Sequence, residues 1–308
     1  MRRSTAALFY PIFHAVLLAS MISCATDPDT LFSRLNSGTT GIVFRNLLKE
    51  NDPEFSILGY PYFYNGGGVA VGDINNDGLE DVLFTGNMVN NALYLNKGNF
   101  KFNDITTGAT LDSFDGWNSG ATMVDINGDG WLDIYVCRSG SSKVSERRNL
   151  LFINNKDLTF TESAEKFGLD DTGYSTQASF FDYDKDGDLD MVLINQSDPK
   201  FARGYQDYMQ TRKQIADPAL ANKLFRNDNG HFVNVSGAAG IRSNIYSFSL
   251  GLNTSDVNQD GWPDIYIGTD FEEPDYLYIN NRNGTFTDSL VAKIDQTSLF
   301  TMGVDVAE

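Results

Sequence analysis

One nine-residue pattern occurs four times in this chain, and it constrains the fold more than any other feature of the sequence. Its copies, called loops 1 to 4, are residues 73–81, 125–133, 182–190 and 256–264. Each has an acid at position 1, Asp or Asn at position 3, Asp at position 5, Gly at position 6 and Asp at position 9. Side chains at positions 1, 3, 5 and 9, with the main-chain carbonyl at position 7, supply the oxygen shell that calcium prefers, and Gly at position 6 permits a sharp bend.

The pattern predicts four calcium-binding loops with five ligands each. The predicted metal ligands are Asp73, Asn75, Asp77, Leu79 and Asp81 in loop 1, Asp125, Asn127, Asp129, Trp131 and Asp133 in loop 2, Asp182, Asp184, Asp186, Asp188 and Asp190 in loop 3, and Asp256, Asn258, Asp260, Trp262 and Asp264 in loop 4. An acidic β-turn is the alternative, because Asp-Gly and Asn-Gly sequences form tight turns without a metal. All four copies keep the acid at position 9, which a simple turn does not need, and this favours the metal. An EF-hand is not expected, because its loop ends in Glu at position 12 and lies between helices.

Runs of strand-forming residues recur around every loop and predict the architecture. In the first repeat they are residues 68–73, 81–86, 91–96 and 100–105. Four short strands per repeat, joined by turns rich in Gly, Asn and Asp, are typical of a propeller blade. We therefore expect an all-β chain, a β-propeller of four four-stranded blades, in which each loop joins the first strand of a blade to the second.

One further strand is predicted on each side of the four repeats. Residues 302–308 match the run that leads into a loop, so that Glu308 takes position 1 of a fifth loop. They predict the first strand of a fifth blade, and hence a partial ring from a longer protein, with a closed four-bladed ring as the alternative. Residues 40–46 are similar to the fourth run of a blade and predict a lone outer strand.

The stretch YNGGGVAVGDINNDGLEDVLFTGN, residues 64–87, resembles the FG-GAP/VCBS repeat family, and the likeness runs from about residue 40 to the end of the sequence. Within that family, it is similar to surface lipoproteins of Bacteroidetes related to cartilage acidic protein, which often carry a further C-terminal domain of the ASPIC/UnbV type. The resemblance implies a seven-bladed propeller with calcium on one face and ligand contacts usually on the other.

The first residues have the features of a targeting segment. A basic start at Arg2 and Arg3 is followed by a broken apolar run over residues 6–19, which is too short for a stable membrane span. Small residues before Cys24 resemble a bacterial lipobox, which predicts a lipoprotein signal peptide over residues 1–23 and a lipid on Cys24. An ordinary signal peptide cleaved elsewhere is the alternative. We expect a tether over residues 24–39, the propeller over residues 40–308, and a lipid-anchored location at the outer membrane or cell surface.

Charge and cysteine content exclude several functions. The formal net charge of −18 argues against a nucleic-acid partner. Cys137 is the only cysteine besides Cys24, so no internal disulfide framework is expected, and its apolar surroundings predict a buried thiol. His231 is the only histidine beyond the signal peptide, and nothing around it suggests a catalytic site.

Two sets of residues are candidates for ligand contacts. The longest connection between second and third strands, in blade 3, carries basic and aromatic residues, and the predicted ligand-binding residues are Lys200, Arg203, Tyr205, Tyr208, Arg212 and Lys213. The alternative is a short helix that packs its aromatic side on the blade. Aromatic residues also precede the loops, at Trp117, Tyr174, Phe248 and Phe300. They are candidates for a sugar-stacking ring around the axis or, alternatively, for packing between blades.

Three functions are compatible with these features. The leading hypothesis is a calcium-binding, non-enzymatic module on the cell surface that binds or adheres to a glycan or protein ligand. The second is a propeller enzyme acting on polysaccharide, which requires two carboxylates facing each other at the axis. The third is a structural spacer that holds a C-terminal domain.

Overall fold

In the computed structural model, which describes residues 31–50, 53, 55–112, 116–140, 143–198, 217–242, 244, 246–271 and 273–307, the strands form four antiparallel sheets. The chain divides into two units, Met1–Asn36 and Ser37–Glu308, and all the described strands belong to the second unit. Each sheet contains four strands that are consecutive in sequence, so that each sheet is one blade. The predicted all-β propeller of four four-stranded blades is confirmed.

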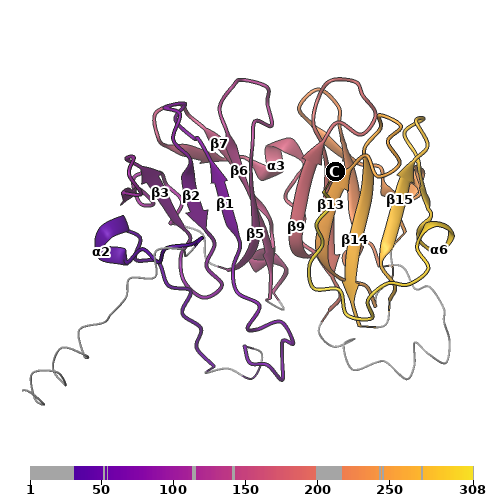
Figure 1. Cartoon of the computed structure of the whole chain (residues 1–308), viewed down its shortest axis with the longest axis horizontal. Helices are drawn as coiled ribbons and strands as arrows, with labels where there is room; N and C mark the ends of the chain where they lie inside the picture. Colours follow the sequence, from indigo (N-terminus) through magenta and orange to yellow (C-terminus); the bar gives the residue numbers. More distant parts are fainter. Residues whose placement is uncertain are drawn as a thin grey trace, which may run out of the picture. The chain divides into compact units, whose positions relative to one another are not determined.

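Every blade has the same order of strands, and its first two strands are joined by one of the four loops. Blade 1 contains β1 (Val69–Gly72), β2 (Asp81–Phe84), β3 (Ala92–Asn96) and β4 (Phe102–Asp104); blade 2 contains β5 (Trp117–Val124), β6 (Asp133–Ser139), β7 (Leu150–Asn154) and β8 (Phe160–Glu162); blade 3 contains β9 (Tyr174–Phe181), β10 (Asp190–Gln196), β11 (Lys223–Asn227) and β12 (Phe232–Asn234); and blade 4 contains β13 (Phe248–Ser255), β14 (Asp264–Asp270), β15 (Tyr276–Asn280) and β16 (Phe286–Asp288). The four first strands, β1, β5, β9 and β13, lie side by side, and each contacts the next (Figure 1).

Packing between blades follows the alternation of side chains along a strand. On β6, Ile134 and Val136 belong to a hydrophobic cluster shared with blade 1, whereas Tyr135 and Cys137 belong to the cluster shared with blade 3. Both faces of this strand are therefore buried, which explains its continuous run of apolar residues. Cys137 is a free thiol and only 1% exposed, so the predicted buried thiol is confirmed.

Glycine allows the first strands of neighbouring blades to approach closely. The N–H of Gly68 donates a hydrogen bond of 2.8 Å to the carbonyl oxygen of Ser119 in the next blade. At the equivalent place in blade 2, a Cβ added to Gly120 would lie 2.3 Å from the carbonyl oxygen of Thr176. A larger residue at either position would push the blades apart.

The stretch before the C-terminus takes the place of a further first strand, but it is not a strand. The N–H of Thr301 donates to the carbonyl oxygen of Thr269 in blade 4 over 3.0 Å, and Val304 lies against Gly251 and Gly268. Within the described part of the chain, no strand is assigned after β16. The first strand of a blade pairs with the second strand of the same blade, and the described residues contain no such partner here.

The predicted outer strand over residues 40–46 is wrong. Its start belongs to a short helix, α2 (Ser37–Thr40), and residues 41–50 have no strand pairing. Side chains hold this segment to blade 1 instead. Phe44 stacks on Phe84 with ring centroids 5.2 Å apart, and the N–H of Val43 donates to the hydroxyl of Tyr94 over 3.2 Å.

The remaining helices in the described part of the chain are single turns. They are the 3₁₀ helix η1 (Val144–Glu146), α3 (Ala164–Phe167), α5 (Ser236–Ala239) and α6 (Leu290–Lys293). The last three follow the fourth strands of blades 2, 3 and 4, and α3 and α5 end at left-handed glycines, Gly168 and Gly240. None of the described helices has the length and apolar character needed to cross a membrane.

Candidate calcium loops and axial cavity

Two left-handed residues give each loop its shape. Gly at position 6 has φ values of 84°, 83°, 99° and 87° in loops 1 to 4, as the motif predicts. Position 4 is left-handed as well, at Asn76, Gly128, Lys185 and Gln259, with φ values of 57°, 69°, 61° and 57°. Asn and Gly favour this conformation, whereas Lys and Gln carry no such signal, so the motif alone does not predict it.

Carboxylates at positions 1 and 5 hold the loop in shape by accepting hydrogen bonds from its main-chain N–H groups. In loop 1, the position-1 carboxylate accepts hydrogen bonds of 3.1 Å and 2.7 Å from the N–H groups at positions 5 and 6. The same two hydrogen bonds measure 2.9 and 2.8 Å in loop 2, and 2.9 and 2.6 Å in loop 4. In the same loops the position-5 carboxylate accepts from the N–H at position 7, over 2.9, 3.0 and 2.9 Å. The acidic turns considered as the alternative are therefore part of these loops.

The acid at position 9 connects the loop to the third strand. All four of these residues, Asp81, Asp133, Asp190 and Asp264, are 0% exposed. One oxygen accepts from the N–H of the Asn that ends the third strand, over 2.7 to 2.8 Å. The other accepts from the N–H at position 2, over 3.0 to 3.3 Å. In this fold the turn itself uses the acid at position 9, contrary to the expectation from the sequence. Each oxygen of that acid still keeps a lone pair for a cation.

Burial makes the position-9 carboxylates costly to ionise. Desolvation raises the pKa of Asp133 to about 6 and that of Asp190 to about 7, and it raises the pKa values of Asp81 and Asp264 in the same direction. Nearby loop carboxylates add like-charge repulsion at each of these sites. A bound dication would favour the ionised forms and so offset both effects.

Loop 3 gives the clearest test of whether the residues suit calcium. Ligand oxygens of Asp182, Asp184 and Asp190 all lie within 4.8 Å of one another. The Oδ1 atoms of Asp182, Asp184 and Asp188 are buried and have no hydrogen-bond partner. Buried carboxylate oxygens without a donor are unfavourable unless a cation coordinates them. The residues of loop 3 therefore fit a hard dication.

Basic side chains lie beside two of the other loops. Lys156 forms an ion pair of 3.3 Å with Asp129 in loop 2, and Arg282 forms one of 2.9 Å with Asp260 in loop 4. The hydrogen bond from Arg282 lowers the pKa of Asp260. Since Asp129 and Asp260 are the position-5 acids, these cations would compete with a metal for the same carboxylates.

Three of the four aromatic residues that precede the loops are buried in hydrophobic clusters, so the four do not form an exposed ring for sugar stacking. Trp117, Tyr174 and Phe248 are 4%, 6% and 1% exposed, whereas Phe300 is 55% exposed. The segment before β1 covers this end of the axis, because its Tyr60, Tyr62 and Phe63 form one hydrophobic cluster with Trp117 and Phe248. The sequence did not predict this cluster, since no local pattern marks the three residues.

The predicted ligand-binding residues Lys200, Arg203, Tyr205, Tyr208, Arg212 and Lys213 lie outside the described residues, as does Cys24. Their roles stay predictions.

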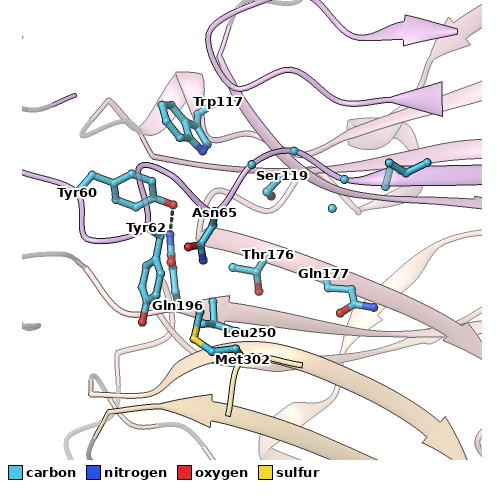
Figure 2. A pocket seen from close by; sticks show the side chains of 16 residues that line it. Tyr60, Tyr62, Asn65, Trp117, Ser119, Thr176, Gln177, Gln196, Leu250 and Met302 are labelled. Carbon is cyan, nitrogen blue, oxygen red and sulfur yellow. Dashed lines mark hydrogen bonds between the residues drawn. The ribbon is translucent and has the colours of Figure 1, made fainter. Parts of the chain in front are cut away.

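A cavity of about 340 Å³, called the axial cavity, lies beside the first strands of the blades. It is lined by side chains from blades 1 to 4 and from the segment before β1 (Figure 2).

The comparisons with known proteins match the repeat pattern. The model of the FG-GAP-like repeat matches residues 73–136, 140–193 and 256–307, more than half of the chain. The chain belongs to the FG-GAP-like repeat family. Two of the matched FG-GAP-like segments begin at the first residue of a loop, so the loops are part of the family's repeating unit.

One curated relative extends this FG-GAP-like similarity. Cartilage acidic protein 1 from Xenopus tropicalis is 28% identical over 193 residues, which are 62% of this chain and 28% of the relative. The chain thus spans less than a third of the length of that protein.

Proposed function

We propose that this chain is a calcium-stabilised binding module at the cell surface, which recognises a glycan or protein ligand. Membership of the FG-GAP-like repeat family and the similarity to cartilage acidic protein 1 fit a non-enzymatic binding module. The net charge of −18 supports a partner other than nucleic acid.

Calcium is the part of the proposal with the most direct support. The observation that carries it is the set of buried, unpaired carboxylate oxygens on Asp182, Asp184 and Asp188 in loop 3. When bound, calcium would neutralise these acids, and the residues of loop 3 would hold it through side chains and the carbonyl at position 7. Because the loops connect the first and second strands, the ion would stabilise the blades themselves.

The lining of the axial cavity supports binding rather than hydrolysis. Its described residues are all uncharged, whereas glycoside hydrolysis requires two carboxyl groups on either side of the bond. The nearby Asp270 accepts a hydrogen bond of 3.0 Å from Tyr62, and the loop acids lie at the other end of the strands. A polysaccharide-cleaving enzyme is therefore the weaker hypothesis.

A thermal melt in calcium and in chelator tests the calcium part. We expect calcium to raise the melting temperature, because it binds the folded state preferentially. Asp184→Asn should reduce this increment, while Asp295→Asn, an exposed acid outside the loops, should leave it unchanged. Equal melting temperatures in calcium and chelator for the unmodified chain would reject the proposal.

Export and lipid attachment at Cys24 are a separate part of the proposal. They rest on the basic start, the apolar run and the small residues before Cys24. Labelled fatty acid supplied to a bacterial host that expresses the full chain should appear on the unmodified protein and not on Cys24→Ser. Equal labelling of the two would contradict lipidation at this residue.

A further inference from the structure

The axial cavity has the size and position of a small-molecule site. Its volume of about 340 Å³ falls at the lower end of the range for such sites, roughly 300–1,000 Å³. In Figure 2, Asn65, Thr176 and Gln196 lie between Trp117 and Met302, and Gln177 lies to the right of them. Side chains from several blades therefore surround one space.

The lining combines uncharged hydrogen-bonding groups with apolar ones. Amides are supplied by Asn65, Gln177 and Gln196, and Val69, Leu250 and Met302 supply apolar surface. An amide presents a donor and an acceptor side by side, which suits a pair of neighbouring hydroxyl groups. A charged ligand would lose hydration without gaining a partner of opposite charge from the described lining, so an uncharged ligand is favoured.

One lining group is held in place and left unsatisfied. The Nε2 of Gln196 donates hydrogen bonds to the hydroxyls of Tyr60 and Ser139, which fixes the orientation of the amide. Its Oε1 is buried and has no hydrogen-bond partner, and the residue as a whole is only 1% exposed. A buried amide oxygen without a donor is unfavourable, and a ligand hydroxyl that reached this atom from the cavity would satisfy it.

From this geometry we infer that the axial cavity binds one neutral sugar residue. The ring's hydroxyl groups contact the amides of Asn65, Gln177 and Gln196, and its C–H surface lies against Val69 and Leu250. The inference rests on the proposed binding function, and it assigns the ligand to the axis rather than to the predicted basic connection of blade 3.

A matched pair of substitutions on β1 tests the location. Val69 and Val71 lie on the same strand and are 56% and 57% exposed, but only Val69 lines the cavity. Val69→Trp should fill the cavity without disturbing the core, and Val71→Trp is its control. Gln177→Ala, with the exposed Gln296→Ala as control, removes one amide and should weaken binding about fivefold to tenfold.

The measurement is saturation-transfer NMR on the full chain in calcium, with glucose, galactose, mannose, fucose and N-acetylglucosamine as probes and glucuronate as the charged comparison. We expect signal from at least one neutral sugar, its loss in Val69→Trp and its retention in Val71→Trp. Absence of signal from all five neutral sugars, or signal that survives Val69→Trp, would overturn the inference. A thermal shift with calcium in the same samples separates this failure from failure of the proposed function.

Discussion

The side chain of Asn280, at the end of β15, donates a hydrogen bond of 2.8 Å to the carbonyl oxygen of Tyr183 in loop 3 of the preceding blade. Asn154, at the end of β7, makes the same 2.8 Å contact with Ile74 in loop 1. The main-chain N–H of each Asn also binds the position-9 acid of its own blade. One residue thus connects the loop of its own blade to the loop of its neighbour.

Replacement of Asn280 by Ala should destabilise the fold. The substitution leaves the buried carbonyl oxygen of Tyr183 and the partly buried one of Pro263 without their side-chain donor, so we expect a loss of about 1–3 kcal/mol in the free energy of unfolding. Asn281→Ala is the matched control, because Asn281 is exposed. Urea denaturation measures both, and equal stability of the two variants would contradict the proposed connection.

Removal of Arg282 should strengthen calcium binding by loop 4. Its guanidinium lies 2.9 Å from the position-5 carboxylate of Asp260, where it would compete with a bound metal. The pair is partly exposed, so we expect a gain of only a few-fold in affinity for Arg282→Ala. Calorimetric titration with calcium tests this, with Arg242→Ala as the control because Arg242 pairs with Asp288 outside the loops. Weaker calcium binding by Arg282→Ala would show that the arginine supports the site.

Without calcium, the protein should become less stable as the pH rises from about 4 to about 7. Burial raises the pKa of Asp133 to about 6 and that of Asp190 to about 7 in the folded state, whereas an unfolded Asp titrates near pH 4. Between these values the folded state holds protons that the unfolded state has released, so the free energy of unfolding falls with rising pH. Bound calcium would favour the ionised forms and should reverse this trend.

Urea denaturation at pH 5 and pH 8, with chelator and with calcium, measures this effect. The predicted result is lower stability at pH 8 in chelator and higher stability at pH 8 in calcium. Stability in chelator that is greater at pH 8 than at pH 5 would contradict the assigned cause.

The repeats made the blades predictable, because the loop motif and the strand runs are local in sequence. The dual role of position 9 was not predictable in the same way, since the Asn that binds Asp133 is 21 residues further along the chain. The cluster of Tyr60, Tyr62 and Phe63 under Trp117 was also missed, because it depends on contacts between distant segments. The prediction of an outer strand near Phe44 was wrong for the same reason. The side chains of this segment contact blade 1, whereas its backbone does not pair with a strand.

Cys137 should be unreactive in the native protein. It is 1% exposed between blades 2 and 3, and burial raises the pKa of its thiol, so little thiolate is available to react. In a Cys24→Ser background, a disulfide reagent should label it only after unfolding. Rapid labelling without denaturant would mean that the packing between these blades opens readily.

Equilibrium dialysis of the full chain against radioactive calcium measures whether the four loops bind calcium. We predict uptake that saturates at four ions per chain, one for each loop, with dissociation constants on the order of 10⁻⁴ to 10⁻³ M, the range typical of extracellular calcium-binding modules. Asp184→Asn should lower the uptake. No uptake by the folded chain at millimolar calcium would contradict the claim and leave the loops as acidic turns.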